Sequence, residues 1–401
     1  MVTIQNKSQC CGCHACQNVC AKEAIKLVLD SEGFAYPKIN QERCVDCGAC
    51  ETVCPVLHSP EEKENDNQRG YLIQIKDEKI RKESTSGGSF TAIASWVIER
   101  GGVVFGASLD IRKKEVAHRW VDTADGLSLF RNSKYVQSNI GNCYKETREF
   151  LKKGRWVCFS GTPCQIEGLK CFLRKDYERL VTVDVVCYGI PSPGMFRDYL
   201  SWQQQRIGGR FTKMLFREKR LSYNYTSVSI FNEQSDKDYH SGVERDKFMR
   251  SFFSDMNVRP SCYACCFKKR YRVSDFTIWD CYDVKAFSKH FDEEGTNRVL
   301  VHTEKGEGIL EAIKNDIRWE EYKDLEHFIA DETAMVKSVR KPRQREAFFD
   351  DYARMDYGEL MDKWFPDTWK VRLNSFLRMT AFRLGVYNPA KRIVKKILGK
   401  N

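Results

Sequence analysis

Short apolar runs alternate with segments of helical periodicity through the middle of the chain. The runs with the length and composition of strands are 71–75, 103–107, 155–159 and 180–186. The segments between and after them in which apolar residues recur at helical spacing are 89–99, 144–152, 165–173 and 193–204. Because strands and helices alternate, we expect an α/β body with a mixed sheet.

The pattern changes on both sides of this body. Short strands are expected at 25–29 and 34–39, and the polar stretch 59–69 is typical of a linker. After about residue 207 the alternation becomes irregular, with hairpin-like runs at 212–217 and 225–231 and strands at 275–279 and 298–302. We therefore predict five parts: a first domain at 1–58, the linker at 59–69, two halves of the body at 70–155 and 156–335, and a basic helical tail at 336–401.

Eight cysteines near the amino terminus repeat one spacing. The first run has the spacing C-x2-C-x2-C-x3-C, and the second run repeats it: Cys10, Cys13, Cys16, Cys20, then Cys44, Cys47, Cys50, Cys54. This is the bacterial two-cluster ferredoxin spacing, in which three thiolates of each run hold one 4Fe-4S cluster and the fourth binds the other. We therefore expect one cluster on Cys10, Cys13, Cys16 and Cys54, and the other on Cys44, Cys47, Cys50 and Cys20.

Other cysteine chemistry fits this spacing less well. A zinc ribbon needs only two C-x2-C pairs, and a disulfide framework needs an oxidising compartment. Pro55 follows the second run, whereas Ala21 follows the first, which predicts a slightly looser first loop. Cys11, beside the first predicted ligand, is expected to be a spectator.

Length and composition limit the class of protein. With 401 residues, 42% of them apolar, the chain can bury a large core and form two or three domains. We find no signal-peptide pattern and no apolar run long enough to span a bilayer. Cluster thiolates require a reducing compartment, so we expect a cytoplasmic protein.

Two turns in the body are candidate ligand sites. The sequence STSGGS at 84–89 precedes a helical segment, where its N–H groups either bind a phosphate or simply cap the helix. The sequence SGTPCQ at 160–165 follows a strand and begins a helix, so the thiol of Cys164 is expected near the positive end of that helix.

Further cysteines follow in the body. Cys187 ends a predicted strand, and Cys262 and Cys265 form a C-x2-C pair. Each of them alone is more often a small buried apolar residue than a ligand. Together with Cys164 they favour a third metal site.

Six motifs occur in a fixed order: STSGGSF at 84–90, SKYVQS at 133–138, SGTPCQ at 160–165, DVVCYGIPSP at 184–193, RPSCYAC at 259–265 and RVSDFTI at 272–278. In this combination the chain resembles the coenzyme F-420 hydrogenase/dehydrogenase beta-subunit family over about residues 1–315. Because it also has a two-cluster ferredoxin domain, it is similar to bacterial members found among cell-surface polysaccharide genes.

The resemblance implies an FAD-containing reductase with an additional 4Fe-4S cluster. Carried over by position, the FAD would be lined by Ser86, Gly87, Gly88, Lys134, Tyr135, Gln137, Gly161 and Thr162. The third cluster would be held by Cys164, Cys187, Cys262 and Cys265, with Cys266 and Cys281 as alternatives. Lys134 would meet the diphosphate or the reduced flavin, unless it is an ordinary solvated lysine. The chain departs from the family at 279–282, where WDCY replaces a glycine-aspartate-aromatic run.

Two functions follow as hypotheses. The first is an iron–sulfur flavoprotein oxidoreductase that passes electrons between the clusters and FAD to reduce or oxidise a small organic substrate, in cell-surface polysaccharide synthesis. The second is an electron-transfer subunit of a hydrogenase or dehydrogenase complex that has no substrate of its own. Both need a redox partner, such as a ferredoxin or a dehydrogenase. No catalytic residue can be assigned, because fold analogy does not choose a substrate.

The carboxy-terminal segment is strongly basic. Between Lys370 and Asn401 there are nine Lys and Arg residues and no acidic residue, in a chain with a net charge of +11. Interleaved apolar residues predict two amphipathic helices broken near Asn388 and Pro389. Either these helices pack on the body with cations outermost, or they contact the inner face of the membrane as a peripheral anchor. One cationic segment is not a groove-reading motif, so we expect no nucleic-acid partner.

Overall fold

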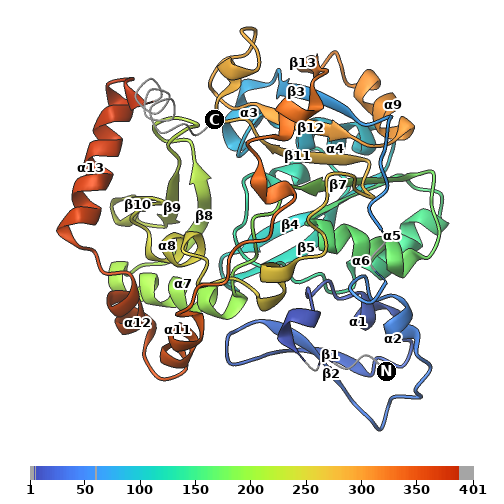
Figure 1. Cartoon of the computed structure of the whole chain (residues 1–401), viewed down its shortest axis with the longest axis horizontal. Coiled ribbons are helices and arrows are strands. Elements are labelled where there is room, and N and C mark those ends of the chain that lie inside the picture. The colour runs from blue at the N-terminus through green and yellow to red at the C-terminus, as the bar shows by residue number, and fades with distance from the viewer. Residues whose placement is uncertain (1–3, 5, 59–60, 388–401) are drawn as a thin grey trace.

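The computed structural model describes residues 4, 6–58 and 61–387. They form an amino-terminal module, a central sheet with helices on both faces, and a second lobe built on a smaller sheet (Figure 1). The expected α/β body with a mixed sheet and an amino-terminal ferredoxin-type module is confirmed.

The amino-terminal module contains one hairpin and two short helices. Its elements are α1 (Ala15–Val19), β1 (Ile25–Leu29), β2 (Ala35–Ile39) and α2 (Ala49–Thr52), preceded by a 3-10 turn at Lys7–Gln9. Strands β1 and β2 pair antiparallel, with Ile25 opposite Ile39, close to the bounds expected from the sequence. Helices α1 and α2 contact each other, so the two cysteine runs that contain them lie side by side.

The central sheet has eight strands in the order β13-β3-β12-β11-β7-β6-β4-β5. The strands are β3 (Arg69–Ile75), β4 (Val103–Asp110), β5 (Glu115–Val121), β6 (Val157–Gly161), β7 (Leu180–Val185), β11 (Phe276–Asp280), β12 (Asn297–Val301) and β13 (Ile317–Tyr322). The neighbouring pairs β4–β6, β6–β7 and β7–β11 are parallel. The other neighbouring pairs of this sheet are antiparallel. The expected strands are present, whereas β5 and β13 were missed because these edge strands carry charged outward residues and so form no apolar run.

Helices cover both faces of this sheet. Helices α4 (Ser89–Glu99) and α9 (Glu304–Ala312) pack on one face, and α5 (Cys143–Lys152) and α6 (Pro163–Leu173) pack on the other. Successive side chains of β4 point to opposite faces of the sheet. Val104 packs in the apolar core beneath α4 and α9, and Phe105 packs in the core beneath α5 and α6. Two short helices, α3 (Glu78–Glu83) and α10 (Leu325–Ile329), contact β3.

The second lobe surrounds a three-stranded antiparallel sheet. Its strands are β8 (Phe211–Glu218), β9 (Ser227–Asn232) and β10 (Tyr239–Gly242), and its helices are α7 (Pro193–Ile207), α8 (Lys247–Phe253), α11 (Arg345–Tyr352), α12 (Tyr357–Trp364) and α13 (Trp369–Arg383). Phe348 of α11 and Leu360 of α12 are fully buried in the core of this lobe. The segment expected as a tail therefore begins with two core helices. The second amphipathic helix expected after Asn388 falls outside the described residues.

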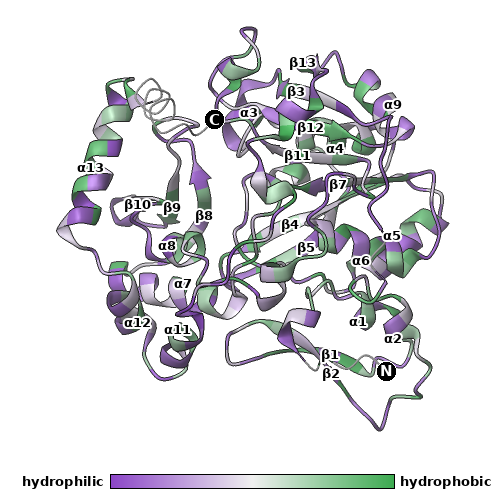
Figure 2. Cartoon of the chain, viewed as in Figure 1, coloured by the Kyte–Doolittle hydropathy of each residue, from purple (hydrophilic) through white to green (hydrophobic). Residues whose placement is uncertain are grey.

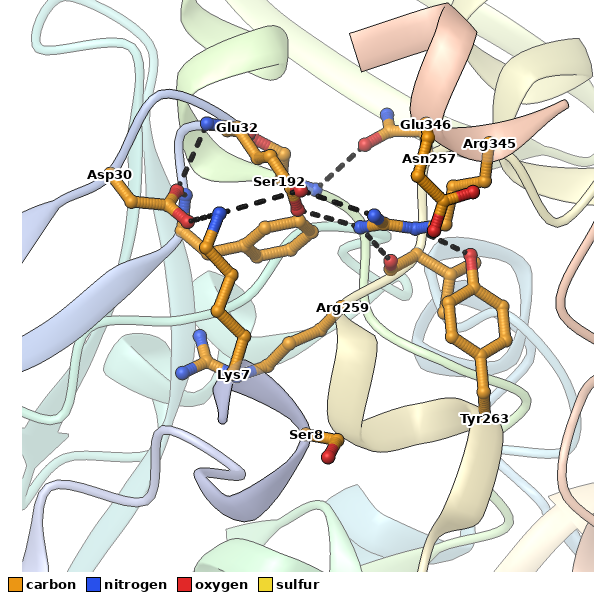
Figure 3. Close-up of polar contacts among 12 residues, drawn as sticks. Lys7, Ser8, Asp30, Glu32, Ser192, Asn257, Arg259, Tyr263, Arg345 and Glu346 are labelled. Carbon is orange, nitrogen blue, oxygen red and sulfur yellow. Dashed lines mark hydrogen bonds and ion pairs between the residues drawn. The ribbon is translucent and has the colours of Figure 1, made fainter. Parts of the chain in front are cut away.

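A buried ion pair fixes the amino-terminal module to the second lobe (Figure 3). The guanidinium of Arg345, in α11, donates to both carboxylate oxygens of Glu32, at 3.2 and 2.7 Å. Ser192 donates to the Glu32 carbonyl at 2.7 Å, and the Gly194 N–H donates to the Gly33 carbonyl at 3.1 Å. A side chain at Gly33 would meet the Gly194 backbone, so these two backbone segments approach each other as closely as glycine allows.

We expect Arg345→Ala to destabilise the protein by about 1.5–3 kcal/mol, because it removes two charge-assisted hydrogen bonds from the half-buried Glu32 carboxylate, which keeps Lys7 at 3.4 Å as its remaining partner. Lys341→Ala is the matched control, since Lys341 pairs with Glu346 at a site where both side chains are more than half exposed. It should cost about 1 kcal/mol or less. Urea unfolding of the cluster-loaded protein measures both, and equal losses would show that the Arg345 pair does not hold the module.

Candidate metal centres

The four cysteines expected to hold the first cluster line one pocket. Cys10, Cys13 and Cys16 come from the first run and Cys54 from the second, as the crossed pattern requires. Burial raises the pKa of the Cys16 thiol to about 12, so in the absence of metal this group is protonated. Thiolate ligation there must release protons. The pocket therefore has the donor set that a 4Fe-4S cluster needs.

The second expected ligand set lies nearer the surface of the module. Cys47 is exposed, and Cys20, Cys44 and Cys50 are half-buried. The Ala24 N–H donates to the Cys20 sulfur at 3.3 Å, a contact of the kind that tunes cluster potential. This side of the module is the part of the cysteine array that a partner protein can approach.

A second pocket is lined by the four cysteines expected for the third cluster: Cys164, Cys187, Cys262 and Cys265. Strands β6 and β7 are parallel, so their carboxyl ends meet at one edge of the sheet. Cys164 follows β6 on the first turn of α6, and Cys187 follows β7. Cys262 lies in the 3-10 turn Pro260–Ala264, and Cys265 directly follows that turn.

The two alternative ligands are not equivalent. Cys266 lines the same pocket as the four expected cysteines. Cys281 instead packs in a separate apolar cluster with Leu72, Trp279 and Phe328. Of the two alternatives, only Cys266 is positioned to replace a ligand.

The arrangement suits a cluster better than a single ion. Among the described residues, no group of three His, Cys, Asp or Glu side chains converges closely enough to hold one metal ion. In a 4Fe-4S cube each iron takes its own thiolate, so the four sulfurs surround the cube without meeting at a point. Burial raises the pKa of Cys187 to about 11 and that of Cys265 to about 12, and the nearby Lys268 ammonium partly opposes this for Cys187.

Arg259 joins the first-cluster loop to the third-cluster turn. Its side chain is fully buried and donates to the Cys10 carbonyl at 2.7 Å, to Gln137 Oε1 at 2.8 Å and to the Ala35 carbonyl at 3.0 Å. The guanidinium also lies 4.3 Å from the ring centroid of Tyr36. Sequence reasoning missed this residue, although it is the first residue of the RPSCYAC motif.

Gln137 completes this contact from the body. Its amide nitrogen donates to the carbonyls of Cys11 and Gly12, at 3.1 and 3.3 Å. Gly12 has a φ of +69°, and a Cβ there would lie 3.0 Å from the Arg259 Cζ and closer still to Gln137. Only glycine fits, because the left-handed backbone and the close approach both exclude a side chain.

Hydrogen bonds and an ion pair bring the motifs of the body together. Thr85 Oγ1 lies 3.0 Å from Ser133 Oγ, which joins the Ser/Gly turn to the SKYVQS loop. The other end of this loop contacts the SGTPCQ turn, since Gln165 donates to Ser138 Oγ at 2.9 Å. The third junction is the buried ion pair of Asp184 with Arg272, at 3.0 Å, which joins the last strand motif to DVVCYGIPSP. These contacts thus join motifs that lie far apart in the sequence.

The Ser/Gly turn expected at the flavin makes its contacts within the protein. Ser86 Oγ donates to the Thr296 carbonyl at 2.5 Å, and the Ser89 N–H donates to Asn297 Oδ1 at 3.1 Å. A Cβ at Gly87 would meet the backbone of β3 and β12, and one at Gly88 would lie 2.7 Å from Ile75 Cγ2. Packing of the helix against the sheet therefore accounts for both glycines without a phosphate.

The other residues expected at the flavin lie along the SKYVQS loop and at the start of α6. Gly161 and Thr162 precede α6, where Thr162 Oγ1 lies 3.1 Å from Cys164 Sγ. Tyr135 packs among Phe216, Phe252 and Phe253. Gln137 faces the amino-terminal module instead, through its contacts with Cys11 and Gly12.

Lys134 is the residue on this loop whose surroundings suit an anion. Its ammonium donates to the Leu129 and Arg131 carbonyls, at 2.9 and 2.8 Å, and burial lowers its pKa to about 7. Within the described ranges no carboxylate forms an ion pair with it. A half-buried lysine of this kind can bind a diphosphate, whose negative charge would favour the protonated ammonium.

A polar aromatic network next to the Ser/Gly turn was also missed. Tyr223 lies 3.0 Å from Ser86 and stacks on Tyr282 with ring centroids 5.4 Å apart. Arg217 is buried and pairs with Asp280 at 2.5 Å, which holds the pKa of that carboxyl below its usual value despite its burial. Asp280 and Tyr282 belong to the WDCY segment, so the departure from the family pattern lies beside the expected flavin residues.

Comparison with known proteins agrees with these features. Residues 9–57 match a 4Fe-4S dicluster domain, and residues 40–100 match a second model of the same description. Residues 154–324 match the model for the C terminus of the coenzyme F420 hydrogenase/dehydrogenase beta subunit. No curated protein matches the chain.

Among solved structures, the chain is similar to a chain of the F420-reducing [NiFe] hydrogenase complex from Methanosarcina barkeri. The identity is 17%, the TM-score is 0.44, and the match covers 68% of this chain and 95% of that chain. The family models give the more specific result. The chain therefore contains a 4Fe-4S dicluster domain, followed by the carboxy-terminal domain of the coenzyme F420 hydrogenase/dehydrogenase beta-subunit family.

Proposed function

We propose that this protein is an iron–sulfur oxidoreductase that carries electrons between a redox partner and a flavin-linked site in its body. Each 4Fe-4S cluster, when bound, exchanges one electron at a time. The exposed Cys47 side of the module would meet the partner, such as a ferredoxin or a dehydrogenase. The body would act on a small organic substrate in cell-surface polysaccharide synthesis.

One observation carries this proposal: the two cysteine-lined pockets are neighbours. Cys11 and Val56 line both the pocket with the first ligand set and the pocket with Cys164 and Cys187. Cys13 packs so closely against Gly168 of α6 that a Cβ added at Gly168 would lie 2.9 Å from the Cys13 Cβ. Electron transfer needs short gaps between centres, and this contact between the module and the body supports such a route.

Cys11 has a role in this contact. It was expected to be a spectator, and we propose that it remains a non-ligand whose buried thiol fills the space between the two pockets. A buried cysteine is a small, weakly polar side chain, which suits the narrow space between the two pockets.

For the flavin, we propose that FAD lies along the SKYVQS loop, between the Ser/Gly turn and Thr162. FAD would supply the conversion of single electrons into a two-electron step at the substrate. Lys134 supports this position, because it is a half-buried cation whose polar contacts are backbone carbonyls. The contacts of Gly87 and Gly88 do not add support, since packing explains them.

The alternative is an electron-transfer subunit without its own substrate. The exposed Cys47 of the second ligand set favours a partner in either case, so the discriminating experiment concerns the body. Anaerobically prepared protein should oxidise or reduce a candidate metabolite at the expense of a chemical reductant or oxidant when no partner protein is present. If electrons pass only to an added protein partner, the alternative is correct.

We expect about twelve irons per chain after anaerobic reconstitution, because twelve cysteines are assigned to three cubes. Cys262→Ser and Cys47→Ser should each lower the count toward about eight, with loss of the body cluster and of one module cluster, respectively. Cys158→Ser is the control, since Cys158 is buried inside β6 on the α4 face. A wild-type count near eight would remove the third cluster, and loss of iron in Cys266→Ser but not in Cys262→Ser would reassign the ligand.

We expect heat-treated protein to release up to about one FAD per chain, with binding weakened roughly tenfold, or about 1.4 kcal/mol, by Lys134→Gln. The reason is loss of the cation that we assign to the diphosphate. Lys152→Gln is the control, because Lys152 lies exposed on α5. Release of FMN, or no binding of added FAD, would contradict the assignment and favour a pure electron carrier.

We expect Arg259→Gln to lower the midpoint potential of the first cluster, because the positive charge of Arg259 stabilises the reduced, more negative state and the substitution removes that charge. A shift of about 59 mV corresponds to a tenfold change for a one-electron couple. Arg259→Lys should shift the midpoint potential less than Arg259→Gln does, because it keeps the positive charge while losing the forked guanidinium contact. Redox titration followed by electron paramagnetic resonance measures both, with the exposed Arg343→Gln as control. Equal potentials in Arg259→Gln and wild type would limit Arg259 to a docking role.

A further inference from the structure

Helix α13 turns large apolar side chains toward solvent. Trp369 is 69% exposed, Phe376 58% and Leu377 56%. Leu373 and Leu384, which are 46% and 69% exposed, continue the same stripe. The five positions follow the spacing i, i+4, i+7, i+8 and i+15, which places them on one side of a helix with 3.6 residues per turn. Figure 2 shows apolar and polar residues alternating along this helix at the outer edge of the molecule.

The opposite side of α13 is fixed to the second lobe. The ring of Phe382 lies 4.9 Å from that of Tyr225, centroid to centroid. Ser375 donates to Glu244 at 2.8 Å, and Arg378 lies 4.0 Å from the same carboxylate. At the start of the helix, Thr368 accepts a hydrogen bond from the Val371 N–H. These contacts orient the helix, so the apolar stripe faces outward as a consequence of how the helix is held.

Cations border this stripe. By helical spacing Lys370 lies on one side of it, and Arg372 and Arg383 lie on the other. No acidic residue occurs from Thr368 to the end of the sequence, and five more Lys or Arg residues follow Asn388. The packed tail was expected to place cations outermost, but the outward face combines aromatic and leucine side chains with flanking cations.

We propose that α13 is an interfacial helix that lays its apolar stripe into an anionic lipid surface. Trp, Phe and Leu on one face with Lys and Arg beside them are the composition of such helices. The described residues contain no helix that could cross a membrane, so the contact would be peripheral. A second copy of the chain is a poorer occupant, because it would bring the same positive charges face to face.

The location of α13 suits this contact. In Figure 1 the helix lies beside the three-stranded sheet, on the far side of the second lobe from the central sheet. The amino-terminal module, with exposed Cys47, lies elsewhere on the molecule. The protein could therefore rest on a membrane by α13 while the second ligand set stays accessible to a redox partner. This inference does not depend on the identity of the substrate or on FAD.

Sedimentation of the full-length, cluster-loaded protein with vesicles tests the proposal. We expect binding to vesicles of phosphatidylcholine with roughly 30% phosphatidylglycerol, and at least tenfold weaker binding to phosphatidylcholine alone or in high salt. Phe376→Asp combined with Leu377→Asp should weaken binding at least tenfold without altering the iron count. Val28→Asp is the matched control, because Val28 is 47% exposed on β1 of the amino-terminal module.

Three outcomes would overturn the proposal. The first is no binding to anionic vesicles at low salt, and the second is binding that the paired substitutions in α13 leave unchanged. The third is a wild-type dimer, measured by light scattering, that the paired substitutions dissociate while vesicle binding is absent in both proteins. That result would assign the apolar stripe to a second copy of the chain.

Discussion

The buried guanidinium of Arg259 is the contact on which the relation of the module to the body depends. It comes from the turn that carries Cys262 and Cys265, yet its hydrogen bonds end on the Cys10 and Ala35 carbonyls of the module. A buried charge must be satisfied on all sides, so neither partner can shift without a large cost. One side chain thereby fixes the spacing between two cysteine-lined pockets. The Glu32–Arg345 pair holds the other end of the module in the same way.

The pocket lined by Cys164, Cys187, Cys262 and Cys265 depends on strand direction. Because β6 and β7 are parallel and adjacent, residues just beyond them meet at one sheet edge, which is where open α/β sheets place their ligands. The same edge receives the SKYVQS loop, whose two ends contact the Ser/Gly turn and the start of α6. Helix packing on the two faces leaves the edge as the place where polar and thiol groups can collect. The fold thus favours a ligand site at this edge of the sheet.

The second lobe separates this chemistry from an exposed apolar surface. Its core takes in α11 and α12, while α13 contributes no fully buried residue and keeps its aromatic stripe outside. Exposed apolar area of this kind is unfavourable in water, and contiguous apolar patches often mark interaction sites. The lobe therefore has the properties of a platform that holds α13 at a distance from the cysteine pockets.

The sequence by itself indicated the central strands, the helices between them and a two-cluster 4Fe-4S domain at the amino terminus. Local spacing is enough to predict a cluster-binding motif in a run such as Cys10 to Cys20. Apolar runs predicted the central strands because both faces of the sheet are buried. Only tertiary structure decided that Cys266 lines the third pocket and Cys281 does not, that Gly87 and Gly88 serve packing, and that Gln137 and Arg259 meet at the module. These are contacts between residues far apart in sequence, and neither spacing nor periodicity encodes them. The outward orientation of the α13 stripe is of the same kind, since the face that packs is set by Tyr225 and Glu244 of another part of the chain.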